Sequence, residues 1–242
     1  MHQSTVSAHR PPVPPLLPAR LSSLFLPPDC VGCGQQGAVL CRRCRFGLLA
    51  TSAVVVESGG EPVYAAAPFA GTVRHIVTGL KYRNRRDAAR VLARLIAERI
   101  ELGAVDLVTW APTTDRRARH RGFDQAELLA RELARLLGAP SRRLLYRRHG
   151  PAQTGRSRAE RLALDHRSAF RGHSRRPGLR VVVVDDVVTT GSTLLAARES
   201  LWAAGVAEVV CVAAAATPPG HASPGGLRGG GVSLTPPEGR HR

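Results

Sequence analysis

The sequence of 242 residues predicts an α/β fold in which a parallel sheet is flanked by helices. Two observations support this prediction. Short apolar runs alternate with amphipathic stretches across residues 60–216, and strands separated by helices favour a parallel sheet covered on both faces. The run Val181–Val184 is apolar at every position, as expected of a strand that is buried on both sides.

The elements within residues 60–216 follow from periodicity and from residues that start or stop helices. The predicted strands are short and mostly apolar; they are Val63–Ala67, Asp106–Ala111, Val181–Val184 and about Ala207–Ala214. The predicted helices have apolar residues at helical spacing; they are Asp87–Leu102, a helix from the N-cap Asp124 to the stop signal Gly138, and about Ser192–Ala204.

The regions outside this domain have a different composition. Residues 1–23 form a proline-rich leader and residues 217–242 a glycine- and proline-rich tail, and we expect both to be disordered. Residues 141–180 are rich in arginine and indicate a basic segment that is mobile or depends on a partner. No apolar run approaches the roughly 20 residues of a membrane helix, and prolines interrupt the only candidate secretion signal. We therefore expect a cytoplasmic protein without membrane insertion.

The chain is strongly basic, with 35 Lys and Arg residues against 18 Asp and Glu residues and a formal charge of +17. Such a charge fits a nucleic acid as a partner, and it also fits a codon preference for arginine. The aromatic content of 4% gives little support to base stacking. Lys81 is the only lysine, so codon preference does not explain it and we expect it to have a function.

Four cysteines form two Cys-x-x-Cys pairs within residues 24–52. Each pair can hold one side of a tetrahedral metal ion, so this region is predicted to be a structural Zn²⁺ module. Disulfides fit less well without a secretion signal, and a redox Cys-x-x-Cys explains only one pair. Cys211 lies in a predicted strand and is expected to be buried as a small apolar residue. The expected ligands are Cys30, Cys33, Cys41 and Cys44.

The segment after Val184 places two carboxylates, Asp185 and Asp186, before a loop of small residues that opens a helix. N–H groups and hydroxyls at a helix N-terminus can bind a phosphate, and nearby carboxylates can accept hydrogen bonds from sugar hydroxyls. The pattern therefore predicts a sugar phosphate as the ligand. It lacks the Gly-Lys-Ser/Thr of a Walker P-loop. The predicted phosphate-binding residues are Thr190, Gly191, Ser192 and Thr193.

This segment resembles the 5-phosphoribosyl diphosphate signature of type I phosphoribosyltransferases. Three further stretches and the two cysteine pairs resemble the ComF family of competence-associated phosphoribosyltransferase-like proteins; the stretches are Ala111–Gln125, Leu80–Tyr82 and Gln153–Arg161. Asp124 stands where that family usually has Asn. The resemblance covers about residues 24–216 and implies the type I phosphoribosyltransferase fold. It also implies that Asp185 and Asp186 hold the ribose hydroxyls while residues 189–193 bind the 5′-phosphate.

The resemblance further implies a transfer of phosphoribose from phosphoribosyl diphosphate to an unidentified acceptor, with Mg²⁺ and fixed cations neutralising the leaving diphosphate. Arg116 and Arg121 would bind the diphosphate, since a guanidinium matches phosphate oxygens. The candidate catalytic residues are Lys81, Asp185, Asp186 and Arg158. The alternative that the resemblance implies is a non-catalytic accessory protein that binds a nucleotide or phosphoribosyl diphosphate during uptake or processing of single-stranded DNA. Its partners would be single-stranded DNA or DNA-processing proteins.

Overall fold

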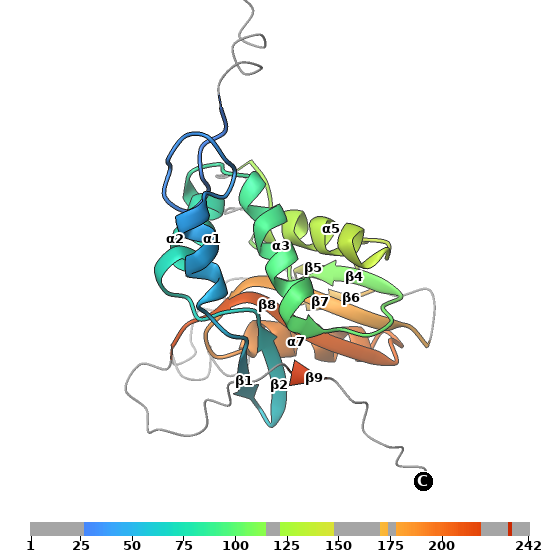
Figure 1. Ribbon diagram of the computed structural model, residues 1–242. Coiled ribbons are helices and arrows are strands. Elements are labelled where there is room, and N and C mark those ends of the chain that lie inside the picture. The colour runs from blue at the N-terminus through green and yellow to red at the C-terminus, as the bar shows by residue number, and fades with distance from the viewer. Residues whose placement is uncertain (1–26, 115–121, 148–169, 174–177, 219–231, 234–242) are drawn as a thin grey trace, which may run out of the picture.

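The computed structural model describes residues 27–114, 122–147, 170–173, 178–218 and 232–233, and its centre is a five-stranded sheet (Figure 1). The strand order is β1-β2-β8-β7-β4. Strands β2, β8, β7 and β4 run parallel, as predicted, whereas β1 is antiparallel to β2, so the sheet is mixed. The strands are β1 (Val54–Ser58), β2 (Glu61–Ala65), β4 (Leu107–Trp110), β7 (Arg180–Val188) and β8 (Glu208–Ala216).

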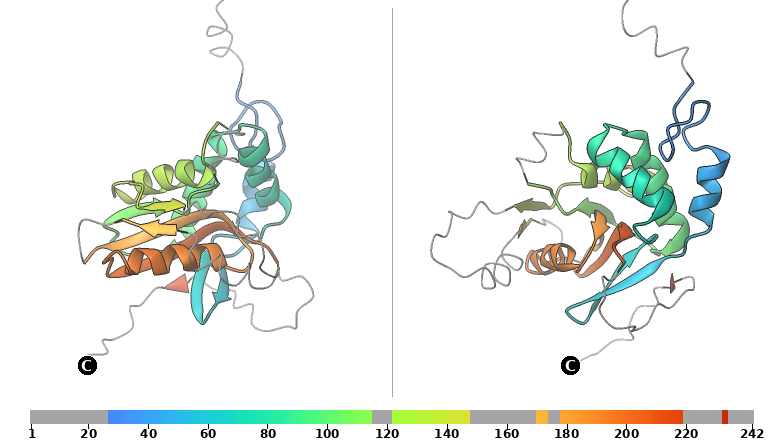
Figure 2. Two further views of the ribbon diagram at one scale, coloured as in Figure 1. Left: turned by 180° about the vertical axis from the view of Figure 1, so that it is seen from behind. Right: turned by 90° about the vertical axis from the view of Figure 1, so that its left-hand side faces the viewer.

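Helices cover both faces of the sheet, as the views in Figures 1 and 2 show. Alternating side chains of β7 define the two cores: Val182 and Val184 pack with one set of helices, and Val181 and Val183 pack with α7. The antiparallel pair of short strands β5 and β6 lies on the α7 side of the sheet. The elements outside the sheet are α2 (Gly71–Tyr82), α3 (Asp87–Arg99), α5 (Gln125–Leu137), β5 (Leu145–Arg147), β6 (Phe170–Gly172) and α7 (Ser192–Trp202).

The cysteine-rich segment and helix α1 (Arg42–Leu49) pack onto α2 and belong to the same apolar core. Val31 and Leu48 are buried in that core together with Ile76 of α2. The guanidinium of Arg99 ties the end of α1 to the sheet region, because it donates hydrogen bonds to Thr51 Oγ1 at 2.7 Å and to the Ala66 carbonyl at 2.9 Å.

Several predicted elements differ from the observed ones at their ends. The first predicted strand lies two residues nearer the N-terminus, as β2. The predicted helix from Asp87 ends at Arg99, because β3 (Ile100–Glu101) then pairs with β9 (Val232–Ser233) inside the range predicted as a tail. Helices α1 and α2, strand β1 and the antiparallel pair β5–β6 were not predicted. Residues 141–180 were expected to be mobile or to depend on a partner. This expectation is wrong for β5 and β6, which form an ordered antiparallel pair with Phe170 buried against the sheet.

Other expectations fall outside the described residues: the leader at residues 1–23, the middle of the basic segment at 148–169, and most of the tail. Within the part of the chain that the structure describes, no helix has the length and apolar character needed to cross a bilayer.

Candidate functional site

The two predicted carboxylates lie within β7 rather than after it. Strand β7 continues through them because the equally long β8 keeps pairing, with Asp185 opposite Ala213 and Val187 opposite Ala215. Asp186 is buried and its Oδ1 lies 2.8 Å from Nζ of Lys81. Lys81 stands in the last turn of α2, where the helix dipole favours a cation. The structure thus brings together the only lysine of the chain and the acidic pair.

The acidic pair has an unusual charge balance. The Asp186 N–H donates a hydrogen bond of 2.8 Å to Oδ1 of Asp185. Burial, together with the negative charge of Asp186, raises the pKa of Asp185 to about 8, although this hydrogen bond and Lys81 act in the opposite direction. The neutral form of Asp185 is therefore favoured, while the neighbouring Asp186 side chain contacts Lys81.

Asp124 contributes a third carboxylate close to the pair, and its negative charge also raises the pKa of Asp185. It is the N-cap of α5, as predicted, since its Oδ1 accepts a hydrogen bond of 3.0 Å from the Ala126 N–H. Its Oδ2 accepts a second hydrogen bond, 2.9 Å from the Thr113 N–H in the loop after β4. One side chain therefore joins the end of β4 to the start of α5. Burial raises the pKa of Asp124.

The predicted phosphate-binding residues form the turn between β7 and α7. The hydroxyls of Thr190 and Ser192 lie 3.0 Å apart, and Thr189 Oγ1 lies 3.1 Å from Thr217 Oγ1 beyond β8. Helix α7 begins at Ser192, so the N–H groups of its first turn face the same turn. Thr189 and Thr190 are exposed and available to a ligand.

Gly191 is required at this turn for two reasons. Its φ of 79° is in the left-handed region, which side chains disfavour. A methyl group at this position would also lie 2.5 Å from Cβ and 2.7 Å from Oγ of Ser58, at the end of β1. The end of β1 in the β1–β2 hairpin therefore packs directly against this turn.

The remaining predicted site residues, Arg116, Arg121 and Arg158, lie outside the described residues. Two polar contacts of the site were not predicted, one made by Asp124 and one by Thr217. The N-cap role of Asp124 was predicted from its position, but its bond to Thr113 depends on tertiary structure. Thr217 follows the last strand of the sheet, and no local pattern marks it as a neighbour of Thr189.

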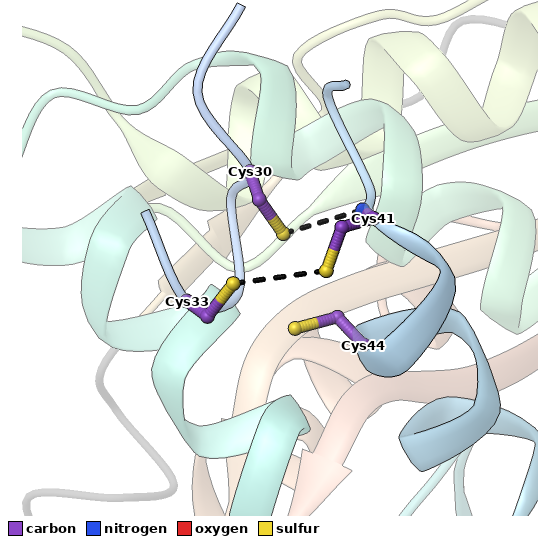
Figure 3. A group of neighbouring side chains, drawn as sticks. All are labelled: Cys30, Cys33, Cys41 and Cys44. Carbon is purple, nitrogen blue, oxygen red and sulfur yellow. Dashed lines mark hydrogen bonds between the residues drawn. The ribbon is translucent and has the colours of Figure 1, made fainter. Parts of the chain in front are cut away.

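The four predicted metal ligands come together at the N-terminus, with all four Sγ atoms within 4.8 Å of one another (Figure 3). The Sγ atoms of Cys33 and Cys41 are 3.7 Å apart. A tetrahedral zinc ion with Zn–S bonds of about 2.3 Å separates its sulfur ligands by about 3.8 Å, so this cluster can bind zinc. A methyl group on Gly32 would lie 2.7 Å from Cys44 Sγ, which explains the glycine within the first pair.

The backbone favours the thiolate form of Cys30, whereas burial and the neighbouring cysteine side chains raise the pKa of Cys44. Burial raises the pKa of Cys30, but N–H groups of Cys41, Cys33 and Gly32 outweigh that effect and lower the pKa to about 6. One of these bonds runs from the Cys41 N–H to Cys30 Sγ at 3.4 Å. By contrast, Cys211 is buried, as predicted, and burial raises the pKa of its thiol to about 12. Cys211 is therefore not a reactive thiol.

Comparison with known proteins identifies the class of this domain. Residues 124–224 match the phosphoribosyl transferase domain family. Similar solved structures include the glutamine phosphoribosylpyrophosphate amidotransferase from B. subtilis, at 25% identity and a TM-score of 0.39 over 54% of this chain and 26% of that one. An adenine phosphoribosyltransferase from Thermoanaerobacter pseudethanolicus has 20% identity and a TM-score of 0.33 over 55% and 68%. The family match shows that the chain contains a domain of the phosphoribosyltransferase type.

The curated relatives identify the family. DNA utilization protein YhgH of Escherichia coli K12 is 30% identical over 157 residues, which are 62% of this chain and 69% of that protein. Competence protein F of Haemophilus influenzae is 32% identical over 146 residues, and YhgH of Salmonella typhi is 34% identical over 142 residues. The chain belongs to the ComF family of these proteins. The chain spans 63% of the length of the Haemophilus relative and 63% of the Salmonella relative. In both comparisons the match covers 55% of this chain.

Proposed function

We propose that the protein is a phosphoribosyltransferase that binds 5-phosphoribosyl diphosphate and transfers the phosphoribosyl group to an acceptor. The observation that supports this most directly is the adjacency of the acidic pair on β7 and the Thr- and Ser-lined turn before α7. The turn offers hydroxyls and helix N–H groups for the 5′-phosphate, and Asp186 offers acceptors for the ribose hydroxyls.

The proposed reaction is a displacement at C1 of the ribose. The bond between C1 and the diphosphate oxygen breaks with its electron pair on the diphosphate, and a lone pair of the acceptor forms the new bond to C1 while the acceptor proton passes to solvent. Mg²⁺ bound with the substrate would neutralise the diphosphate, and the carboxylate of Asp186 offers oxygen ligands of the kind that Mg²⁺ prefers. Arg116, Arg121 and Arg158 are proposed to bind the diphosphate or close over it.

Isothermal titration calorimetry with phosphoribosyl diphosphate and Mg²⁺ tests the site. We expect the double variant Asp185→Asn with Asp186→Asn to lose binding and to keep its fold. Asp87→Asn is the matched control, because Asp87 is an exposed carboxylate in the first turn of α3. Unchanged binding by the double variant would contradict the site assignment. Release of diphosphate with candidate bases then tests turnover.

The names of the relatives refer to DNA utilization and to competence, which suggests a role connected with DNA. As a second candidate function we propose an accessory protein that binds the ligand or a nucleotide and handles single-stranded DNA. In that case the protein binds the ligand without releasing diphosphate, and it binds a labelled single-stranded oligonucleotide with an affinity that falls as salt is added. Diphosphate release without oligonucleotide binding would refute this alternative. In both proposals the protein is cytoplasmic and its zinc module is structural, so one zinc ion per chain is expected by elemental analysis.

A further inference from the structure

Arg85 connects the cysteine cluster to the corner between α2 and α3. Its Nη1 donates hydrogen bonds to the carbonyls of Cys30 at 3.0 Å and Asp29 at 3.2 Å, and its Nη2 lies 3.4 Å from Asp29 Oδ2. Cys30 is the first cysteine of the cluster. One partly buried guanidinium therefore binds the backbone carbonyl of the first predicted metal ligand.

The same corner is fixed to the turn of α2 that carries Lys81. The N–H groups of Arg83 and Arg85 both donate to the Gly79 carbonyl, at 3.0 Å and 3.2 Å. Asn84 between them adopts a φ of 51°, which folds the chain back on the end of the helix. Arg85 is thus attached to the last turn of α2, where Lys81 meets Asp186 at 2.8 Å.

We propose that Arg85 is a positioning residue that couples the four-cysteine cluster to the acidic pair. A filled cluster fixes the backbone of Asp29 and Cys30, Arg85 transmits that order to the end of α2, and Lys81 is held against Asp186. The importance of this coupling for catalysis rests on the proposed function, whereas the coupling itself does not. It is reciprocal, so whatever orders Lys81 and Asp186 also strengthens metal retention.

The chain provides its own probe for this coupling, because Lys81 is the only lysine. Its ammonium group is paired and its side chain is only 21% exposed, so an amine-reactive ester should modify it slowly. Loss of the pairing should raise its modification rate. Mass spectrometry of the peptide that contains Lys81 separates this reaction from modification of the N-terminal amine.

The experiment compares Lys81 modification in the zinc-loaded full chain, the zinc-stripped chain and zinc-loaded Arg85→Ala. We expect modification to become faster, on the order of tenfold, in both the stripped chain and the variant. Arg90→Ala is the matched control, since Arg90 is an exposed arginine of α3 that pairs with Glu132 at 3.7 Å. Zinc-loaded Asp186→Asn is the positive control, because it frees Lys81 while the cluster stays filled.

The outcomes separate this proposal from the proposed function. An unchanged rate of Lys81 modification in folded, zinc-loaded Arg85→Ala would overturn the role of Arg85. An unchanged rate in the zinc-stripped wild-type chain would overturn the coupling, and this measurement does not depend on whether the variant folds. Acceleration in both samples supports the coupling, whether or not phosphoribosyl diphosphate binds. If the ligand binds, it should also slow zinc transfer to a chromogenic chelator in the wild type and not in Arg85→Ala.

Discussion

Replacement of Gly191 by alanine should be among the most damaging single-methyl changes in this protein. A side chain in the left-handed region costs about 1–2 kcal/mol. The added methyl group would also lie 2.5 Å from Cβ of Ser58, and forcing extra volume into a packed site costs about 1–3 kcal/mol. The two effects together lower the free energy of unfolding by about 2–5 kcal/mol. Because the turn is the proposed phosphate site, affinity for phosphoribosyl diphosphate should fall as well.

Urea denaturation followed by circular dichroism measures this loss, and two variants separate its causes. Gly205→Ala is the matched control, since Gly205 has a φ of 87° and no described atom lies within 4 Å of the added methyl group. It should therefore cost only the backbone part. Removing the obstacle in Gly191→Ala with Ser58→Gly should recover the steric part in a double-mutant cycle. Equal losses in Gly191→Ala and Gly205→Ala would refute the role assigned to Ser58.

Three other changes test the acidic pair, the cap of α5 and the cysteine cluster. Asp185→Asn should stabilise the protein at pH 8 by about 1–3 kcal/mol, since a poorly solvated carboxylate is removed. Because the pKa of Asp185 is raised in the folded state, its contribution to the stability of the wild type is lost as the pH rises from about 4 through about 8. Melting curves at pH 4 should therefore show little difference between the two proteins. Asp124→Ala should cost about 1–3 kcal/mol by chemical denaturation, because it removes the cap of α5 and leaves the Thr113 N–H unpaired; a loss below 0.5 kcal/mol would contradict this. Cys33→Ser should lower zinc retention against a chelator at least tenfold, and retention equal to that of the wild type would argue against a four-sulfur site.

The sheet shows where the sequence was informative. Val181–Val184 was recognised as a buried strand because every residue faces a helix layer, and Asp124 and Gly138 marked the ends of α5 through cap chemistry that is local. Helix α2 was not predicted, although Val73, Ile76, Val77 and Leu80 have helical spacing and are all buried. This helix can therefore be predicted from the apolar spacing of its own residues.

Other features depend on contacts that no local pattern contains. The length of β7 is set by β8, which pairs with it as far as Val188 opposite Ala216. The antiparallel β1 is joined to β2 by Gly59 and Gly60, both with positive φ, and two such residues are typical of a tight hairpin. The pairing of Lys81 with Asp186 brings together segments far apart in the chain. The sequence marked both residues as functional, but their contact required the packing of α2 against the sheet.

The position of β8 within the sheet also has a consequence for biosynthesis. Strand β8 is the last strand of the large sheet in chain order, yet it lies between β2 and β7. On the ribosome, β2 has only β1 as a partner until Val212 emerges to pair with Tyr64. Such distant pairing makes folding slow and leaves apolar strand edges exposed on the nascent chain. The cysteine cluster is complete long before that moment, so metal capture can precede closure of the sheet.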